Sequence, residues 1–530
     1  MTLPSSHTTS PAIPRPPLAT RIVFAMAALK LALHLAVLTI TPYGIHRDEF
    51  LYFSMGRHLR LWRMDFPPMI AVLGNVQRTL FGDSLAAARV LPAIEGTVVI
   101  ILAALIAREL GGRRLAQFLA MLAVLMAPLF LRAANLFQPV VLDQLWWTLA
   151  LFSLARIVRA DERMTPRSWI ALGVVCGLGL LTKFSIFFFA LPALLGLAVT
   201  PMRRALATRW PWVAAIIMLV VGSPSIVGQI ALGFPVLLQM RDLQATQLEH
   251  VTWSAFLSEQ ILLLGPVSLL VAIAGAGALV ASRRLRAFAV LGWTCIFAFL
   301  ILLLLHGKAY YAGPIYPTLL AAGSVQVEQL RLHRAPRLAS GVRWATAAGI
   351  AFLGVVALPL TLPVLSPAKT GAYSVHIGAA PALRDNRGEM GRLPQDFADM
   401  LGWEAQARAL AQAYRSLAPD EQREAVIIGD NYGEASAAEF YGARYHLPSV
   451  VSAAGSWWFF GPGSRAGRVA ITIGVSRGDL TRVAMYGDVR CVGRVVSPWS
   501  VPEERDVPIF IARSPRMTLQ QLWPSLAGRN

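Results

Sequence analysis

The run RIVFAMAALKLALHLAVLTI, residues 21–40, decides the class of fold. It is mostly apolar over a length that crosses the hydrocarbon core of a bilayer, roughly 20 residues, and similar runs recur through the first two thirds of the chain. Of the 530 residues, 56% are hydrophobic and only 15% are charged, with a mean hydropathy of +0.55. Because a soluble domain is far less apolar, the sequence predicts a polytopic α-helical membrane protein.

About eleven transmembrane helices are expected from these runs. Their approximate spans are 21–40, 89–107, 115–132, 139–157, 169–182, 184–200, 211–231, 256–281, 287–306, 310–329 and 343–363. The first run is too long for a signal-peptide core and has no clear cleavage site, so we expect an uncleaved helix. The proline-rich residues 1–20 before it are expected to be a disordered cytoplasmic segment.

The arginines predict the orientation, since cytoplasmic connections retain positive charge. Nineteen arginines lie in residues 15–21 and in alternate connections near 108–114, 156–167, 203–209, 283–286 and 331–343. The connections near 133–138, 183 and 306–309 hold almost none. A cytoplasmic N-terminus in the inner membrane satisfies this alternation.

The net charge of +19 and the pI near 10.7 follow from these arginines, which would meet anionic lipid headgroups. No nucleic-acid-binding motif is present, so membrane lipids are the expected partners. Cys176, Cys295 and Cys491 are too few and too scattered for a disulfide framework or a zinc site. The acidic residues are also too dispersed to specify a metal, so no cofactor is expected.

An odd number of spans places residues 366–530 outside the cytoplasm. The segment EAVIIGDNYGEASAAEFYG predicts a buried strand, a turn and a helix from about Ala435. Later apolar runs, Arg468 to Val475 and Val507 to Ala512, predict further strands. We therefore expect a small extracytoplasmic α/β domain after a transmembrane domain of residues 21–365.

The first external loop, about residues 41–88, is rich in polar residues and opens with Asp48 and Glu49. The next residues mix apolar and basic side chains, which suits a helix lying along the membrane interface. Asp65, Pro67 and Pro68 then form an extended turn before a second amphipathic stretch, Met69 to Phe81. Asp48 and Glu49 would point about 100° apart on a helix. An alternative is that Asp48 only stabilises the helix N-terminus.

Two further external clusters contain candidate functional residues. Asp143 lies a turn inside an apolar helix, where a carboxylate is costly and marks a functional site by default; the alternative is a structural ion pair, perhaps with Arg132. Lys308, Tyr310 and Tyr311 would suit an anionic headgroup. Their alternative is ordinary interfacial anchoring.

The order of these motifs resembles the polyprenyl-phosphate-sugar-dependent glycosyltransferases of the GT-C superfamily. The similarity is greatest to the family 39 group, which is related to protein O-mannosyltransferases and aminoarabinose transferases. The similar segments run over about residues 20–465: the Asp48-Glu49 opening, the Trp62-to-Pro68 turn, DQLWW from Asp143, GLLTKF from Gly179, the Lys308-to-Pro317 segment and GDNYGE from Gly429.

The resemblance implies a GT-C fold and an enzyme that moves a sugar from a polyprenyl phosphate, undecaprenyl phosphate in bacteria, to a lipid, glycan or protein. Asp48 matches the proposed general base of an inverting reaction, with Glu49 as its support. Asp143 matches a second carboxylate that contacts the sugar or stabilises the site. The phosphate is expected to meet Lys308, Tyr310, Tyr311, Lys183 and Arg132, where cations and donors suit an anionic leaving group.

One departure from the family concerns the residue before Pro67. Relatives that modify lipid A have a lysine there, whereas this chain has Phe66, so their sugar specificity does not simply transfer. Asp65 and the two prolines are expected to position the loop or the acceptor, and His250 is a candidate for the acceptor pocket. A transporter or lipid flippase is the alternative function, although no internal repeat typical of that class is evident.

Overall fold

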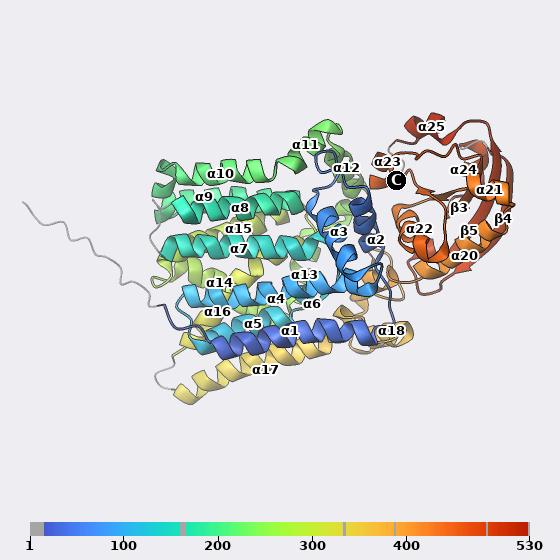
Figure 1. The fold of residues 1–530 in the computed structure, drawn as a ribbon. Helices are drawn as coiled ribbons and strands as arrows, with labels where there is room; N and C mark the ends of the chain where they lie inside the picture. The colour runs from blue at the N-terminus through green and yellow to red at the C-terminus, as the bar shows by residue number, and fades with distance from the viewer. Residues whose placement is uncertain (1–14, 160–165, 332–334, 386–387, 484–485, 528–530) are drawn as a thin grey trace, which may run out of the picture.

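A computed structural model describes residues 15–159, 166–331, 335–385, 388–483 and 486–527, apart from the side chain of His250 (Figure 1). Long helices from the first two thirds of the chain lie alongside one another in a bundle. The C-terminal domain, orange to red in Figure 1, sits at one end of this bundle, and α2 and α3 lie between the two parts. The chain is therefore a multi-pass membrane protein with a small α/β domain after the bundle.

The bundle helices form from the apolar runs. They are α1 (Thr20–Ile40), α4 (Leu85–Glu109), α5 (Arg114–Met126), α6 (Pro128–Ala133), α7 (Pro139–Arg159), α8 (Pro166–Thr182), α9 (Phe187–Ala198), α10 (Trp210–Val221), α11 (Ser223–Ala231), α13 (Trp253–Leu264), α14 (Pro266–Ala281), α15 (Ala289–Leu304), α16 (Tyr316–Gln329) and α17 (Pro336–Thr361). Within the described ranges, five helices are long and apolar enough to cross a membrane, or eight if each bent pair is one span.

Small residues allow the closest helix pair, α14 and α16, to pack backbone to backbone. A Cβ atom on Gly275 would lie 1.9 Å from the carbonyl oxygen of Leu319, and one on Gly323 would lie 1.9 Å from that of Val271. Between helices in lipid, where the hydrophobic effect supplies little, such close packing is a main source of stability. These two glycines let α14 pack closely on α16, the helix that follows the Lys308 segment.

Several predicted spans differ from the structure. The run 115–132 is divided between α5 and α6, and the run 211–231 bends by 53° between α10 and α11. The run 256–281 is not one helix: α13 and α14 meet at an angle of 110°. Gly265 adopts a φ of +77° and Pro266 lacks the N–H that would continue the helix. The run 310–329 is helical only from Tyr316, because residues Ala309–Ile315 form a 3-10 turn that contains Pro314.

The first external loop forms α2 (Arg47–Arg57) and α3 (Met69–Phe81). In α2, which the sequence predicts as a helix along the membrane interface, every residue from Glu49 to Gly56 is buried. One side of α2 packs on α3, and another on α22 (Tyr432–Tyr445) of the C-terminal domain. A buried position between two domains explains this, because both of its faces are covered.

The C-terminal domain contains a five-stranded mixed sheet, counted over the described residues, with the order β2-β1-β3-β5-β4. Its strands are β1 (Val426–Gly429), β2 (Val450–Val451), β3 (Val469–Ile473), β4 (Tyr486–Val496) and β5 (Asp506–Pro515), and α20 (Trp403–Arg415) packs on it with α22. Strand β1 is parallel to β2 and β3, whereas β5 is antiparallel to both its neighbours. The predicted helix begins at Tyr432 instead of Ala435, because Asn431 caps it.

Aromatic side chains hold the domain against the bundle. The ring of Phe440 on α22 lies 5.2 Å from that of Phe50 and 5.5 Å from that of Phe53, both on α2. Phe53 in turn stacks on Phe137, which precedes α7, at 5.4 Å. Ring contacts of this kind contribute beyond the burial of their area, so the first loop, the bundle and the domain share one core.

Candidate active site

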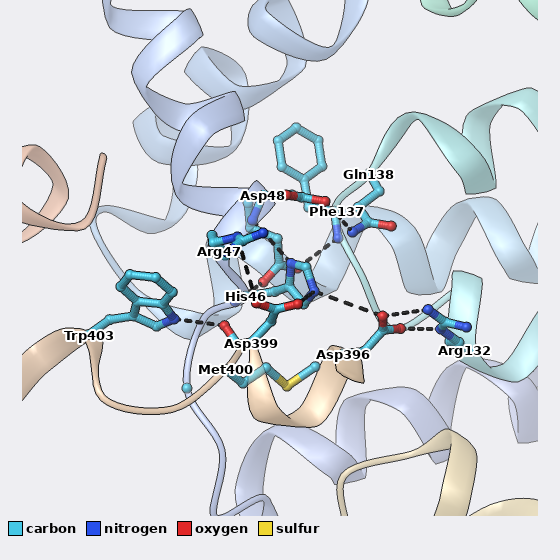
Figure 2. A network of polar contacts seen from close by, with 12 residues as sticks. His46, Arg47, Asp48, Arg132, Phe137, Gln138, Asp396, Asp399, Met400 and Trp403 are labelled. Carbon is cyan, nitrogen blue, oxygen red and sulfur yellow. Dashed lines mark hydrogen bonds and ion pairs between the residues drawn. The ribbon is translucent and has the colours of Figure 1, made fainter. Parts of the chain in front are cut away.

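The start of α2 presents Asp48 to a cavity. His46 caps the helix: its Nδ1 accepts the backbone N–H of Asp48 at 3.1 Å, and its own N–H donates to Glu49 at 2.7 Å. The half-buried carboxylate of Asp48 accepts the hydroxyl of Tyr432 at 2.8 Å and the amide of Gln138 at 3.2 Å. Its two oxygens are therefore held by the C-terminal domain and by the residue before α7, and Figure 2 shows Asp48 beside Gln138.

Glu49 points away from that cavity. It is fully buried, pairs with the guanidinium of Arg89 on α4, and accepts the backbone N–H of Phe137 at 2.8 Å. Two neighbouring carboxylates thus have different surroundings, as the 100° separation on a helix requires. Glu49 fixes α2 to the Phe137-Gln138 loop, and this loop supplies one hydrogen bond to Asp48.

The cavity has a volume of about 500 Å³ and opens where the bundle, the first loop and the C-terminal domain meet. Its charged lining residues in the described structure are Arg47, Asp48, Asp65, Arg132, Lys183, Lys308, Asp385, Asp396, Asp399 and Glu503. Tyr310, Tyr311 and Tyr432 add hydroxyl groups, and Phe184, Phe188 and Leu302 add apolar surface. The cavity can therefore hold a ligand with both a charged and an apolar part.

The predicted phosphate-binding residues come together on the bundle side. The Lys183 ammonium lies 4.7 Å from the ring centre of Tyr311 and 5.9 Å from that of Tyr310. Lys308 donates to Gln247, and burial, with a smaller contribution from Arg132, lowers the pKa of Lys308 to about 8. These contacts leave a cationic, hydroxyl-rich wall next to Asp48, which suits an anionic ligand.

Asp143 lies behind this wall. One carboxylate oxygen accepts the hydroxyl of Ser185 at 2.6 Å, and the other is 3.8 Å from the ammonium of Lys183. Asp143 is absent from the described lining, whereas Ser185 and Lys183 both line the cavity. The proposed alternative of a pair with Arg132 is wrong, because Arg132 binds Asp396. Asp143 can act on a ligand through Lys183.

The residues predicted to position the loop or the acceptor have different surroundings in the structure. Asp65 lines the cavity and accepts the hydroxyl of Ser456 at 2.6 Å, and burial raises the pKa of Asp65. Pro67 also lines the cavity, as does Phe66, which replaces the lysine of lipid A-modifying relatives. Pro68 is buried at the N-terminus of α3 and holds the loop. The side chain of His250 lies outside the described residues.

Several lining residues from the C-terminal domain were not predicted. Asp396 binds Arg132 through both oxygens, and Asp399 lies 3.6 Å from the guanidinium of Arg47 (Figure 2). Burial favours a raised pKa at Asp396, but the charges of Arg132 and His46 outweigh it and the pKa lies below its usual value. Tyr432 lies in the GDNYGE segment that carries part of the family resemblance, but nothing in its local sequence pointed to a contact with Asp48.

Within the described ranges, no group of three or more His, Cys, Asp or Glu side chains could hold a metal ion. What the arrangement offers is a carboxylate held by hydrogen bonds beside cations and hydroxyl groups. Such a pairing suits proton removal at Asp48 and stabilisation of negative charge at the bundle wall.

Comparison with known proteins agrees with this organisation. Residues 65–227 match the family model described as dolichyl-phosphate-mannose-protein mannosyltransferase. Among solved structures, the chain is similar to ArnT from Cupriavidus metallidurans bound to undecaprenyl phosphate, with 17% identity, a TM-score of 0.60, and coverage of 94% of this chain and 100% of that one. The chain therefore has an ArnT-like fold. No curated protein matches the sequence. In this fold, the loop after α1 and the C-terminal domain meet over one cavity.

Proposed function

We propose that this protein is a membrane glycosyltransferase that moves a sugar from a polyprenyl phosphate to an acceptor hydroxyl at the outer face of the cytoplasmic membrane. One observation carries the proposal: the carboxylate of Asp48 and the cations Lys183 and Lys308 open into the same cavity. The match of residues 65–227 to the dolichyl-phosphate-mannose-protein mannosyltransferase model supports the class of reaction. The N-terminus is then cytoplasmic and the C-terminal domain lies outside.

In the proposed reaction Asp48 takes the proton of the acceptor hydroxyl. The freed oxygen attacks the anomeric carbon as the bond from that carbon to the phosphate oxygen breaks, so the polyprenyl phosphate leaves with the bonding electron pair. A single displacement inverts the anomeric configuration. Lys183, Lys308, Tyr310 and Tyr311 stabilise the charge that builds on the leaving phosphate.

The other predicted residues act around this step. Glu49 and Arg89 anchor the helix that carries Asp48, and Asp143 holds Lys183 toward the cavity. Arg132 would be shared between the phosphate and Asp396, because Asp396 already binds its guanidinium. Asp65 and Pro67 line the cavity and would position the acceptor. General acid-base catalysis contributes typically 10² to 10⁴ in rate, so Asp48 is the residue with the largest expected effect.

The test uses purified protein, a panel of undecaprenyl-phosphate sugars and hydroxyl acceptors. Asp48→Asn should reduce transfer by about 10² to 10⁴, while binding of undecaprenyl phosphate stays within a few-fold of wild type. The matched control is Asp83→Asn, a carboxylate of the same loop that pairs with Arg57 and Arg78 outside the cavity.

Full turnover by Asp48→Asn would remove Asp48 as the base. Movement of the lipid across liposomes with no new glycosidic bond would replace the glycosyltransferase with the transporter alternative.

A further inference from the structure

The C-terminal domain reaches the catalytic carboxylate through the first turn of α22. Asn431 caps this helix, its side chain accepting the backbone N–H groups of Gly433 and Glu434, and Glu434 closes the capping box. The cap fixes the direction of Tyr432, the first residue of the helix. Its hydroxyl donates to Asp48 over 2.8 Å, although the two residues are 384 positions apart.

The ring of Tyr432 is also fixed. The guanidinium carbon of Arg47 lies 5.1 Å from the ring centre, and Arg47 pairs with Asp399 and Glu503. Gly433 packs so tightly that a Cβ atom there would lie 2.5 Å from Cγ of Arg47. The tyrosine therefore has little freedom to leave the carboxylate.

We infer that Tyr432 is a positioning residue, contributed by the C-terminal domain, that orients Asp48 and keeps it ionised for proton removal. The inference rests on the proposed role of Asp48 as the base. A hydrogen bond donated to a carboxylate stabilises its charged form, and burial raises the pKa of the Tyr432 hydroxyl, so this group remains a donor at neutral pH.

Other charged and titratable groups also act on Asp48, and they set the background for any change. They are Arg47, Glu49 and Tyr52 on its own helix, His46 at the cap, Lys308 of the bundle and Asp399 of the C-terminal domain. All of these residues remain in place when one hydroxyl is removed from Tyr432, although the electrostatics of Arg47 and Tyr52 also depend on Tyr432. The effect of that removal on Asp48 can thus be measured against the same set of charged and titratable residues.

The experiment is Tyr432→Phe in the full-length protein, which keeps the ring and its contact with Arg47. The ionisation of Asp48 is followed by infrared difference spectroscopy, using Asp48→Asn to identify its carboxyl band. The matched control is Tyr445→Phe, which removes a hydroxyl from the same helix, where it donates to Glu404 at 2.6 Å outside the cavity.

In Tyr432→Phe the titration of Asp48 should move to higher pH by about one unit, the amount expected when a charged group loses one hydrogen bond. The acidic limb of the transfer rate should move in the same direction. Tyr445→Phe should change neither. An unchanged Asp48 titration in Tyr432→Phe, or an equal shift in Tyr445→Phe, would overturn the inference.

The spectroscopic titration needs no sugar donor or acceptor. A protein that shows the Asp48 shift but no glycosyl transfer would contradict the proposed function while leaving the Tyr432-Asp48 coupling established. If Tyr432→Phe transfers sugar and the acidic limb of its rate is not shifted, the Tyr432-Asp48 coupling is contradicted and the proposed function stands.

Discussion

The membrane bundle and the C-terminal domain line one cavity with side chains of opposite charge. Among the described lining residues, the bundle from α6 onward contributes Arg132, Lys183 and Lys308 and no carboxylate. The domain contributes Asp385, Asp396, Asp399 and Glu503 and no cation. Under the proposed reaction, the bundle wall suits the leaving phosphate, and the domain wall suits an acceptor without negative charge at its reactive end. Asp48 lies between the two.

The largest effect on donor binding is expected from removing the cationic wall. Lys183→Gln combined with Lys308→Gln should weaken binding of undecaprenyl phosphate about 100-fold, because each charge-assisted hydrogen bond contributes about 1.5 kcal/mol and 1.4 kcal/mol is a tenfold change. The measurement is a binding isotherm in detergent. Asp385→Asn with Glu503→Gln, on the domain wall, is the control and should not weaken binding; equal losses would show that the walls do not differ in function.

A smaller effect is expected where the walls are joined. Asp396→Asn removes the carboxylate that binds Arg132 through both oxygens. The free energy of unfolding should fall by about 1 to 3 kcal/mol, the range for losing a buried charged hydrogen bond, and the melting temperature followed by tryptophan fluorescence should fall with it. Asp506→Asn, which loses an exposed pair with Arg494, is the control. Identical melting of both variants would mean that the Arg132 pair does not hold the domain.

The smallest effect concerns pH. With a pKa of about 8, Lys308 is charged below pH 8 and neutral above it, so its attraction for a phosphate is present at low pH and lost as pH rises. Affinity for undecaprenyl phosphate should fall by up to about tenfold between pH 7 and pH 9. Lys308→Arg should remove most of this dependence, since arginine stays protonated. A pH dependence that survives in Lys308→Arg would assign the titration to another group.

The residues of the bundle wall can be predicted from the sequence because the patterns that mark them are local. A lysine beside two tyrosines, or a carboxylate inside an apolar helix, is unusual within a few residues and was recognised on that ground. The domain wall has no such signal: Asp396 and Asp399 lie in an ordinary polar segment and become notable only when they meet Arg132 and Arg47. The spacing of residues along the chain does not reveal ion pairs between distant segments.

The differences between the predicted and the observed fold also have physical causes that a local pattern does not carry. Burial of α2 follows from α3 and from the domain that covers it, and its mixed apolar and basic composition gives no sign of that cover. Hydropathy averaged over 256–281 hid the break, although Gly265 and Pro266 were visible in the sequence. Strand β4 was not predicted because most of its side chains are exposed, and exposed edge strands lack a continuous apolar run.

The hydrogen bond between Tyr432 and Asp48 also sets an order of events during biogenesis. Its two ends are 384 residues apart, so at synthesis rates of 5 to 20 residues per second Asp48 emerges from the ribosome about 20 to 80 s before its partner. Through that interval the bundle can insert helix by helix while Asp48 lacks this partner. Under the proposed reaction and orientation, the site is complete only when the last third of the chain has been exported and has folded, so a truncated chain that inserts into the membrane is expected to be inactive.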